Sequence, residues 1–292
     1  SGMPWVDSVF QGICIFMAAF DTGGFSPQSQ SILYYHSFWV EAVAVIVMLW
    51  GAISFSVHYE LWTGNKKAIY KDSEMKALFV SIMLLFILVL IGLSPDKVYS
   101  TVSTMFRKGF FHLISAHSGT GFSTLYAKQF GSMWSPLALI GLIIAMSFGG
   151  CLGSTTGAIK MMRLILVFKA FRAEIKRLMF SDSTVVVEKI HHIREVIVED
   201  KQIKAAVMVA LAFIALYFAG AMVGVYFGYP FLDSLFESTS AAGNVGLSMG
   251  IVQPAMPTVL KVTYMIEMWV CRLEFIAVFV LIGFLISWIK GR

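Results

Sequence analysis

The stretch Ala116-His117-Ser118-Gly119-Thr120-Gly121-Phe122-Ser123 indicates the fold, because it ends an apolar segment, 104–116, that is too short to cross a bilayer. A membrane-spanning helix needs about 20 mostly apolar residues. Longer apolar segments lie on either side, at 76–94 and 133–170, and the topology places their near ends on one side of the membrane. These features predict a short helix that enters from that side, followed by a glycine loop that returns to it.

Two other stretches have the same pattern. Ala19-Phe20-Asp21-Thr22-Gly23-Gly24-Phe25-Ser26 follows a short segment at 4–18, and Ala242-Gly243-Asn244-Val245-Gly246-Leu247-Ser248 follows one at 231–242. All three end in glycine, then Phe or Leu, then serine, and such self-similarity at wide spacing indicates internal repeats. The predicted units are a partial repeat at 1–75, a complete repeat at 76–202 with a broken inner helix, and a complete final repeat at 203–292.

Composition indicates that the bilayer is the solvent for most of the chain. Of 292 residues, 58% are hydrophobic and only 13% charged, whereas about a quarter of an average soluble domain is charged. We expect an all-α membrane protein with apolar helices near 37–58, 76–94, 133–170, 203–228 and 258–289. The three cysteines stand singly and are expected to be core thiols.

The basic residues predict the topology. The loop 59–76 carries four lysines and the segment 160–204 carries ten Lys or Arg, whereas 27–37 and 228–258 carry none. The positive-inside rule places the two basic loops in the cytoplasm. Membrane topology thus explains the net charge of +5 without binding to nucleic acid. The distribution of the basic residues predicts a multi-pass protein of the cytoplasmic membrane.

The glycine loops predict passage of a cation. Non-helical backbone at membrane depth survives only where it lines a watery cavity, and a ring of carbonyls there can replace the water shell of a cation. Each short helix also points its negative C-terminal end at its loop. The alternative is that these are ordinary turn glycines. The predicted ion-binding residues are Thr22, Gly23, Gly24, Gly119, Thr120, Gly121, Asn244, Val245 and Gly246.

A glycine-rich interruption in the middle of 133–170 predicts a gate inside the pore. Four glycines within nine residues break a helix, and the alternative is a small-residue surface for helix packing. The predicted gating residues are Gly149, Gly150, Gly153, Ser154, Thr155, Thr156 and Gly157. Arg272, in the last apolar segment, is predicted to form a positive barrier by bonding carbonyls of this loop, or else to pair with Glu267, Glu274 or Glu41.

Other functional classes have less support. No HExxH motif, nucleophile elbow or paired Asp-rich motif is present, so we expect no enzyme and no covalent cofactor. A coupled secondary transporter would also use broken helices at the midplane. It would need a titratable cluster built from the few available groups, which are Asp21, Glu41, His117, Glu267 and Glu274.

At these residues the chain resembles the Trk/Ktr/HKT superfamily of potassium transporters. The loops AAFDTGGFS, SGTGFS and GNVGLS resemble its filter loops, GGCLGSTTGAIK its intramembrane gating loop, and MWVCRLE the segment that bears the arginine of its last helix. The resemblance implies helix–pore-loop–helix units around a pseudo-fourfold ion pore for potassium uptake. A sodium-permeable or cation-coupled symport transporter of the same superfamily is the alternative. Ala158 and Cys271 stand where the family usually has glycine.

The resemblance also implies partners. Members act as homodimers on a cytoplasmic, nucleotide-binding regulatory ring of the TrkA/KtrA kind, and the segment from Lys160 to Lys204 would dock it; a solvated loop near lipid phosphates is the alternative. Three loops do not close a fourfold filter, so we expect native sequence before Ser1. The resemblance implies a bound potassium ion. Sodium is the alternative, because in this family the first loop largely sets selectivity and it is not among these three loops.

Overall fold

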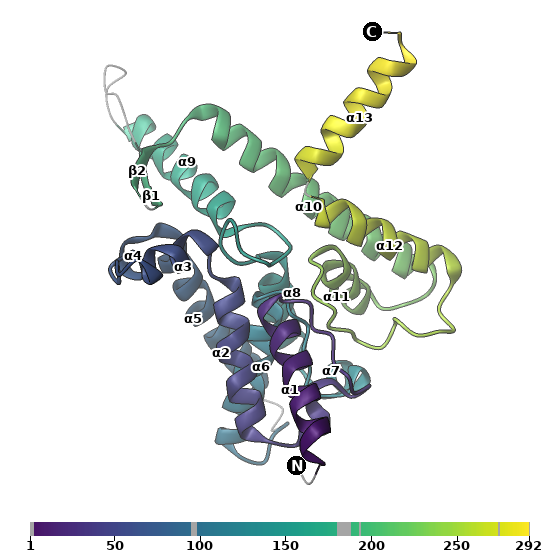
Figure 1. The fold of residues 1–292 in the computed structure, drawn as a ribbon. Helices are drawn as coiled ribbons and strands as arrows, with labels where there is room; N and C mark the ends of the chain where they lie inside the picture. Colours follow the sequence, from purple (N-terminus) through teal and green to yellow (C-terminus); the bar gives the residue numbers. More distant parts are fainter. Residues whose placement is uncertain (1–2, 95–97, 180–187, 193, 274, 292) are drawn as a thin grey trace.

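The chain is almost entirely helical. The computed structural model describes residues 3–94, 98–179, 188–192, 194–273 and 275–291 (Figure 1). The described elements are α1 (Trp5–Phe20), η1 (Ser31–Tyr35), α2 (Phe38–Ala52), α3 (Phe55–Trp62), α4 (Ala68–Lys71), α5 (Ser73–Leu93), α6 (Val102–His117), α7 (Ala127–Met133), α8 (Pro136–Ser147), α9 (Met161–Met179), β1 (Lys189–His192), β2 (Arg194–Ile197), α10 (Asp200–Tyr226), α11 (Phe231–Ala242), α12 (Thr258–Arg272) and α13 (Phe275–Ile289).

The helices pack as repeated units. The long helix α5 packs against the short helix α6 and the inner helix α8, and α10 packs in the same way against α11 and α12. Between units, α2 contacts α6 and α8 contacts α11. Helix α6 from Phe111 onward and most of α11 from Ser234 onward are buried. Two of the three predicted short helices thus lie inside the protein, enclosed by longer ones, and the all-α membrane fold is confirmed.

Helix length and composition mark the membrane-spanning elements. Two helices, α5 and α10, are long and apolar enough to cross a bilayer. Two pairs pass the same test only together, α2 with α3 and α12 with α13, and they bend by 99° and 101°. Figure 1 shows α13 turning away from the direction of α12. The described residues therefore provide two spans, or up to four if each bent pair is one.

Two of the predicted helices, near 37–58 and 258–289, are each divided in two in the structure, into α2 with α3 and α12 with α13. The first ends at Ala52 and resumes at Phe55, and a distant segment bonds the freed backbone groups. The carbonyl of Ala52 accepts from Cys151 N at 3.0 Å, and Phe55 N donates to the carbonyl of Gly153 at 3.0 Å. Contacts with residues 151 and 153 thus satisfy the backbone groups that the break frees.

The two basic loops meet on one side of the molecule. His191 N, in β1, donates to Ser73 Oγ at 3.2 Å, and β1 contacts α5. Strands β1 and β2 are antiparallel, with Ile190 opposite Val196. A small polar cavity of about 140 Å³ lies between the α3–α4 segment and His191. Parts of the two basic segments 59–76 and 160–204 therefore lie on the same side of the molecule.

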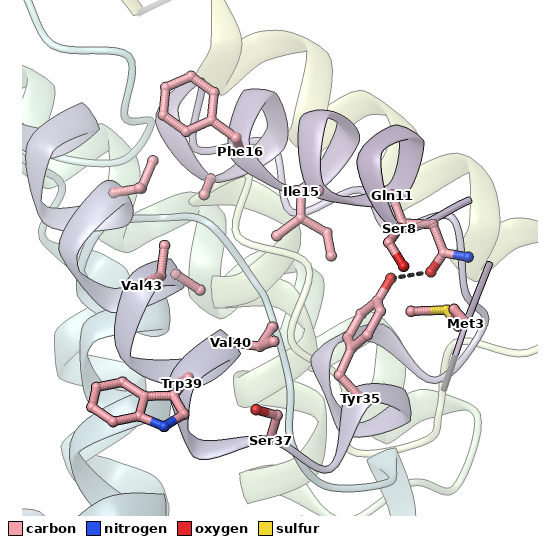
Figure 2. Close-up of a pocket in the computed structure, with 14 residues that line it drawn as sticks. Met3, Ser8, Gln11, Ile15, Phe16, Tyr35, Ser37, Trp39, Val40 and Val43 are labelled. Atoms are coloured by element: carbon pink, nitrogen blue, oxygen red, sulfur yellow. Dashed lines mark hydrogen bonds between the residues drawn. The ribbon is translucent and has the colours of Figure 1, made fainter. Parts of the chain in front are cut away.

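The first unit differs from the other two. Helix α1 packs against α2 and leaves a mostly apolar cavity of about 390 Å³ between them (Figure 2). At its rim Tyr35 Oη donates to Gln11 Oε1 at 2.7 Å. Large apolar side chains of α1, including Trp5 and Phe16, are exposed. In each of the other two units, a long outer helix, α5 or α10, packs against both the short helix and the inner helix. In the first unit, the described contact is between the short helix α1 and the inner helix α2.

Candidate functional site

The three glycine loops have one backbone conformation. Helices α1, α6 and α11 each end one residue before a right-handed cap residue, which the loop follows. Each loop then has left-handed φ at its first and third residues. The pairs are Thr22 (53°) with Gly24 (65°), Gly119 (71°) with Gly121 (81°), and Asn244 (55°) with Gly246 (97°). Thr22 and Asn244 adopt a backbone conformation that is uncommon for residues other than glycine.

Each loop is also bonded to its own helix in the same way. The amide of the middle residue donates to a carbonyl on the last turn of the helix: Gly23 to Ala18 at 2.9 Å, Thr120 to Ser115 at 3.0 Å, and Val245 to Ser240 at 2.9 Å. Equal backbone angles and equal bonds in three separate stretches mean that the repeats predicted from sequence are repeats in the structure.

The loops contact one another in chain order. A Cβ added at Gly24 would lie 1.8 Å from the carbonyl oxygen of Thr120, and one at Gly121 would lie 1.8 Å from that of Val245. The main chains therefore touch where these two glycines stand, which leaves no room for a side chain. At Gly246 the same added atom meets nothing within 4 Å among the described residues. All nine predicted ion-binding residues lie in these loops, and the structure brings the three loops together.

The glycine-rich segment between α8 and α9 folds back on itself. Gly149 N donates to the carbonyl of Ile159 at 2.9 Å, and Gly150 N donates to Thr156 Oγ1 at 2.8 Å. A Cβ at Gly149 would lie 2.0 Å from the carbonyl oxygen of Gly157, so the two arms of this segment are in main-chain contact. We call residues 149–157 the 149–157 loop; all seven predicted gating residues belong to it.

The 149–157 loop contacts all three glycine loops. Thr155 Oγ1 lies 3.1 Å from Thr22 Oγ1 and donates to the carbonyl of Phe20 at 3.1 Å. A Cβ at Gly119 would lie 3.7 Å from Gly157 N, and one at Gly157 would lie 2.3 Å from the carbonyl oxygen of Gly243. The loop therefore lies at the helix-side ends of all three glycine loops.

Arg272, at the end of α12, contacts this loop. Its Nη1 donates to the carbonyl of Thr155 at 3.3 Å. Of the acidic partners considered, Glu41 pairs with Arg107 at 2.6 Å, and Glu267 is bonded by Ser238 Oγ at 3.0 Å. The third, Glu274, lies outside the described residues. The carbonyl contact is thus the one that the structure contains.

Lys160 is a residue whose place the sequence analysis missed. It was grouped with the cytoplasmic basic segment, but it is only 6% exposed. Its ammonium group donates to the carbonyl and, at 3.1 Å, to the hydroxyl of Thr156. The sequence signal that could have predicted a buried Lys160 is its position directly after a glycine-rich segment at mid-membrane depth. Lys160 and Arg272 thus place two cationic groups on carbonyls of one short loop.

Repeated short helices with touching glycine loops, enclosed by longer apolar helices, define a multi-pass helical membrane protein. The chain belongs to the TrkH family, described as cation transport proteins, whose pattern it matches over residues 3–286. It is 31% identical over 274 residues to an uncharacterized cation transporter of Methanocaldococcus jannaschii, a match that covers 94% of this chain and 54% of that protein.

Further relatives have functional names. The Trk system potassium uptake protein TrkH of Halomonas elongata is 28% identical, covering 96% of this chain and 56% of that protein. The crystal structure of the potassium transporter TrkH from Vibrio parahaemolyticus superposes with a TM-score of 0.78 at 22% identity, covering 90% of this chain and 56% of that one. The chain therefore spans about half the length of the relatives it matches, and the last comparison supports the fold.

Proposed function

We propose that the chain forms part of a potassium-uptake pore, in which the ion passes along the three glycine loops and the 149–157 loop gates it. The observation that carries the proposal is the shared left-handed pattern in three loops whose main chains touch. The potassium uptake named for the Halomonas elongata relative supports the choice of ion.

Backbone geometry supports the ion-binding role. Left-handed residues alternating with others let successive carbonyls of a short loop point to one side, where they can replace water around a cation. The helices α1, α6 and α11 end directly at the loops, and the C-terminal end of each carries about half a negative charge. We expect a loop of the same kind to close the ring beside Gly246.

The charges on the 149–157 loop support the gating role. Arg272 and Lys160 both bond its carbonyls, and Thr155 bonds the glycine loop at Thr22. In this state two cationic groups are held at the carbonyls of the loop, where they oppose a passing cation. Opening requires the loop to leave its bonds to Phe20 and Thr22.

The cytoplasmic face supports the proposed partners. Helix α9 and the β1–β2 hairpin form a basic surface beside α5, and we assign it to a nucleotide-binding regulatory ring of the TrkA/KtrA kind. Lys160 no longer belongs to that surface. The pore unit would act as a homodimer in the cytoplasmic membrane. Co-purification of the ring protein with wild type, and its loss on replacing Arg172 and Lys176 with alanine, tests this assignment.

Rubidium uptake tests the proposed function. The protein as its gene encodes it, reconstituted in liposomes, should take up ⁸⁶Rb⁺ in competition with K⁺ and only weakly with Na⁺. Gly121→Ser should lower the preference for K⁺ over Na⁺, and deletion of residues 149–157 should raise the flux. The same flux and preference in both variants and in wild type would show that neither loop has its proposed role.

A further inference from the structure

His112 is a fully buried side chain in α6 with no role in the pore as described above. Its ring packs edge-on against Phe130 and Trp134, with centroids 5.1 and 5.5 Å away. Its Nδ1 lies 2.8 Å from the carbonyl of Lys108, one helical turn back. A carbonyl oxygen only accepts, so Nδ1 carries the proton and Nε2 is an acceptor.

That acceptor binds the chain just beyond the glycine loop. Thr124 N donates to His112 Nε2 at 3.2 Å, and Thr124 is 1% exposed. A buried amide without a hydrogen-bond partner is costly, and the buried imidazole of His112 is the partner of the Thr124 amide. The short segment that leaves the second glycine loop is therefore held to its own helix at Thr124, two residues beyond the carbonyl of Phe122, which accepts from Ser115 Oγ at 2.6 Å.

The last repeat contains the same arrangement with different chemistry. Glu237 lies in α11, seven residues before Asn244, as His112 lies seven residues before Gly119. Its Oε1 accepts from Met249 N at 2.8 Å, and Met249 holds the position that Thr124 holds in the preceding repeat. Glu237 is 2% exposed and also accepts from Ile251 N at 3.1 Å.

The first unit lacks both the acceptor and the amide that the other two units have at these positions. The corresponding residues are Ile15 and Pro27, seven before and five after Thr22. Proline has no amide hydrogen, so nothing at this position needs an acceptor, and Ile15 has none to offer. An acceptor thus stands in the helix only in the two repeats in which the exit segment has an N–H to bond.

The structure assigns to His112 and Glu237 the role of positioning residues for the glycine loops: each is a buried acceptor that fixes the segment leaving its loop. This inference rests on the proposed function, because it gives the two residues an effect on ion selectivity. A loop with one fixed end and one loose end would not hold its carbonyls at the spacing that distinguishes K⁺ from Na⁺.

The test transplants the pair found in the first unit. His112→Ile removes the acceptor, and the double variant His112→Ile with Thr124→Pro also removes the donor. His112→Gln keeps an acceptor oxygen and is the conservative control. Two measurements are made on the protein as its gene encodes it: amide exchange of residues 122–126, and the Rb⁺ over Na⁺ uptake preference.

In the single variant we expect exchange of 122–126 to be at least about tenfold faster and the preference to fall by about tenfold, because one buried donor loses its partner. The double variant and His112→Gln should both recover to within about threefold of wild type. Amide exchange of 20–26 should not change in any of the variants.

A single variant with wild-type exchange and preference, or a double variant no better than the single, would overturn the inference. Where the single variant does not fold, the double variant should, and failure of both also overturns it. If wild type takes up no Rb⁺ at all, the proposed function fails, and the amide exchange still decides whether His112 holds the segment.

Discussion

Replacing Gly24 with alanine should separate two glycine loops. The new methyl would lie 1.8 Å from the carbonyl oxygen of Thr120, whereas ordinary contact begins near 3.4 Å, so the loops must move apart by about 1.6 Å. The left-handed φ of 65° adds a conformational cost of about 1–2 kcal/mol. The new methyl would clash with main-chain atoms of Thr120 and Gly121, so no flexible side chain can move to relieve the clash.

Gly291→Ala is the matched control. Gly291 has φ of 66°, and an added Cβ meets nothing within 4 Å among the described residues. Both variants therefore pay the same conformational cost, and only Gly24→Ala displaces a carbonyl. Carbonyl spacing determines which ion replaces its water shell best. We expect a loss of Rb⁺ over Na⁺ preference of at least about tenfold, roughly 1.4 kcal/mol, in Gly24→Ala alone.

The assay is paired ⁸⁶Rb⁺ and ²²Na⁺ uptake into liposomes at equal protein content, with thermal unfolding as a second reading. A larger loss of stability in Gly24→Ala, together with a loss of preference in that variant alone, would support the carbonyl contact as the basis of selectivity. Unchanged preference in Gly24→Ala, or an equal loss in Gly291→Ala, would refute the reasoning.

Three other changes have calculable outcomes. Ala158 has a left-handed φ of 56°, so Ala158→Gly should relieve about 1 kcal/mol of strain and alter the open time in single-channel recordings. Lys160→Met should raise basal Rb⁺ flux, because the 149–157 loop loses its ammonium partner. Lys176 Nζ lies 2.6 Å from Glu188 Oε1, and this contact lowers the pKa of Glu188. The stabilising effect of this pair should be present above about pH 4.5 and lost as the pH falls further. Faster amide exchange in β1 at low pH would report the loss. The pair is partly exposed, so its contribution to stability has an upper limit of about 1 kcal/mol.

The short helices and their loops were predictable because their signals are local. Glycine followed by an aromatic or leucine and then serine marks the same turn three times, and the apolar segments before it are too short to span. The left-handed conformation of Thr22 was not predictable in this way, since threonine rarely adopts it, whereas asparagine, the residue at 244, is enriched in it. The conformation of Thr22 becomes visible only when the three loops are aligned on Gly119.

The positions of buried polar groups were less accessible from the sequence. Lys160 sits among basic residues of a cytoplasmic segment, and only its contact with Thr156 shows that it turns inward. His112 and Glu237 share a spacing from their loops, but histidine and glutamate share little else. The property they have in common, a buried acceptor facing an amide, belongs to the folded chain.

The breaks in the inner helices have a single physical cause, which explains why local patterns did not predict them. Helix α2 ends where Ala52 bonds Cys151, α3 begins where Phe55 bonds Gly153, and α12 ends where Arg272 bonds Thr155. All of these contacts are made by one loop from another repeat. Because that loop is itself a helix interruption, its free amides and carbonyls must find partners, and they find them in the backbone around the α2–α3 break and in the guanidinium of Arg272. Shortening the loop should therefore straighten α2 into α3, and a helix that stayed bent by about 99° without the loop would show that the cause lies elsewhere.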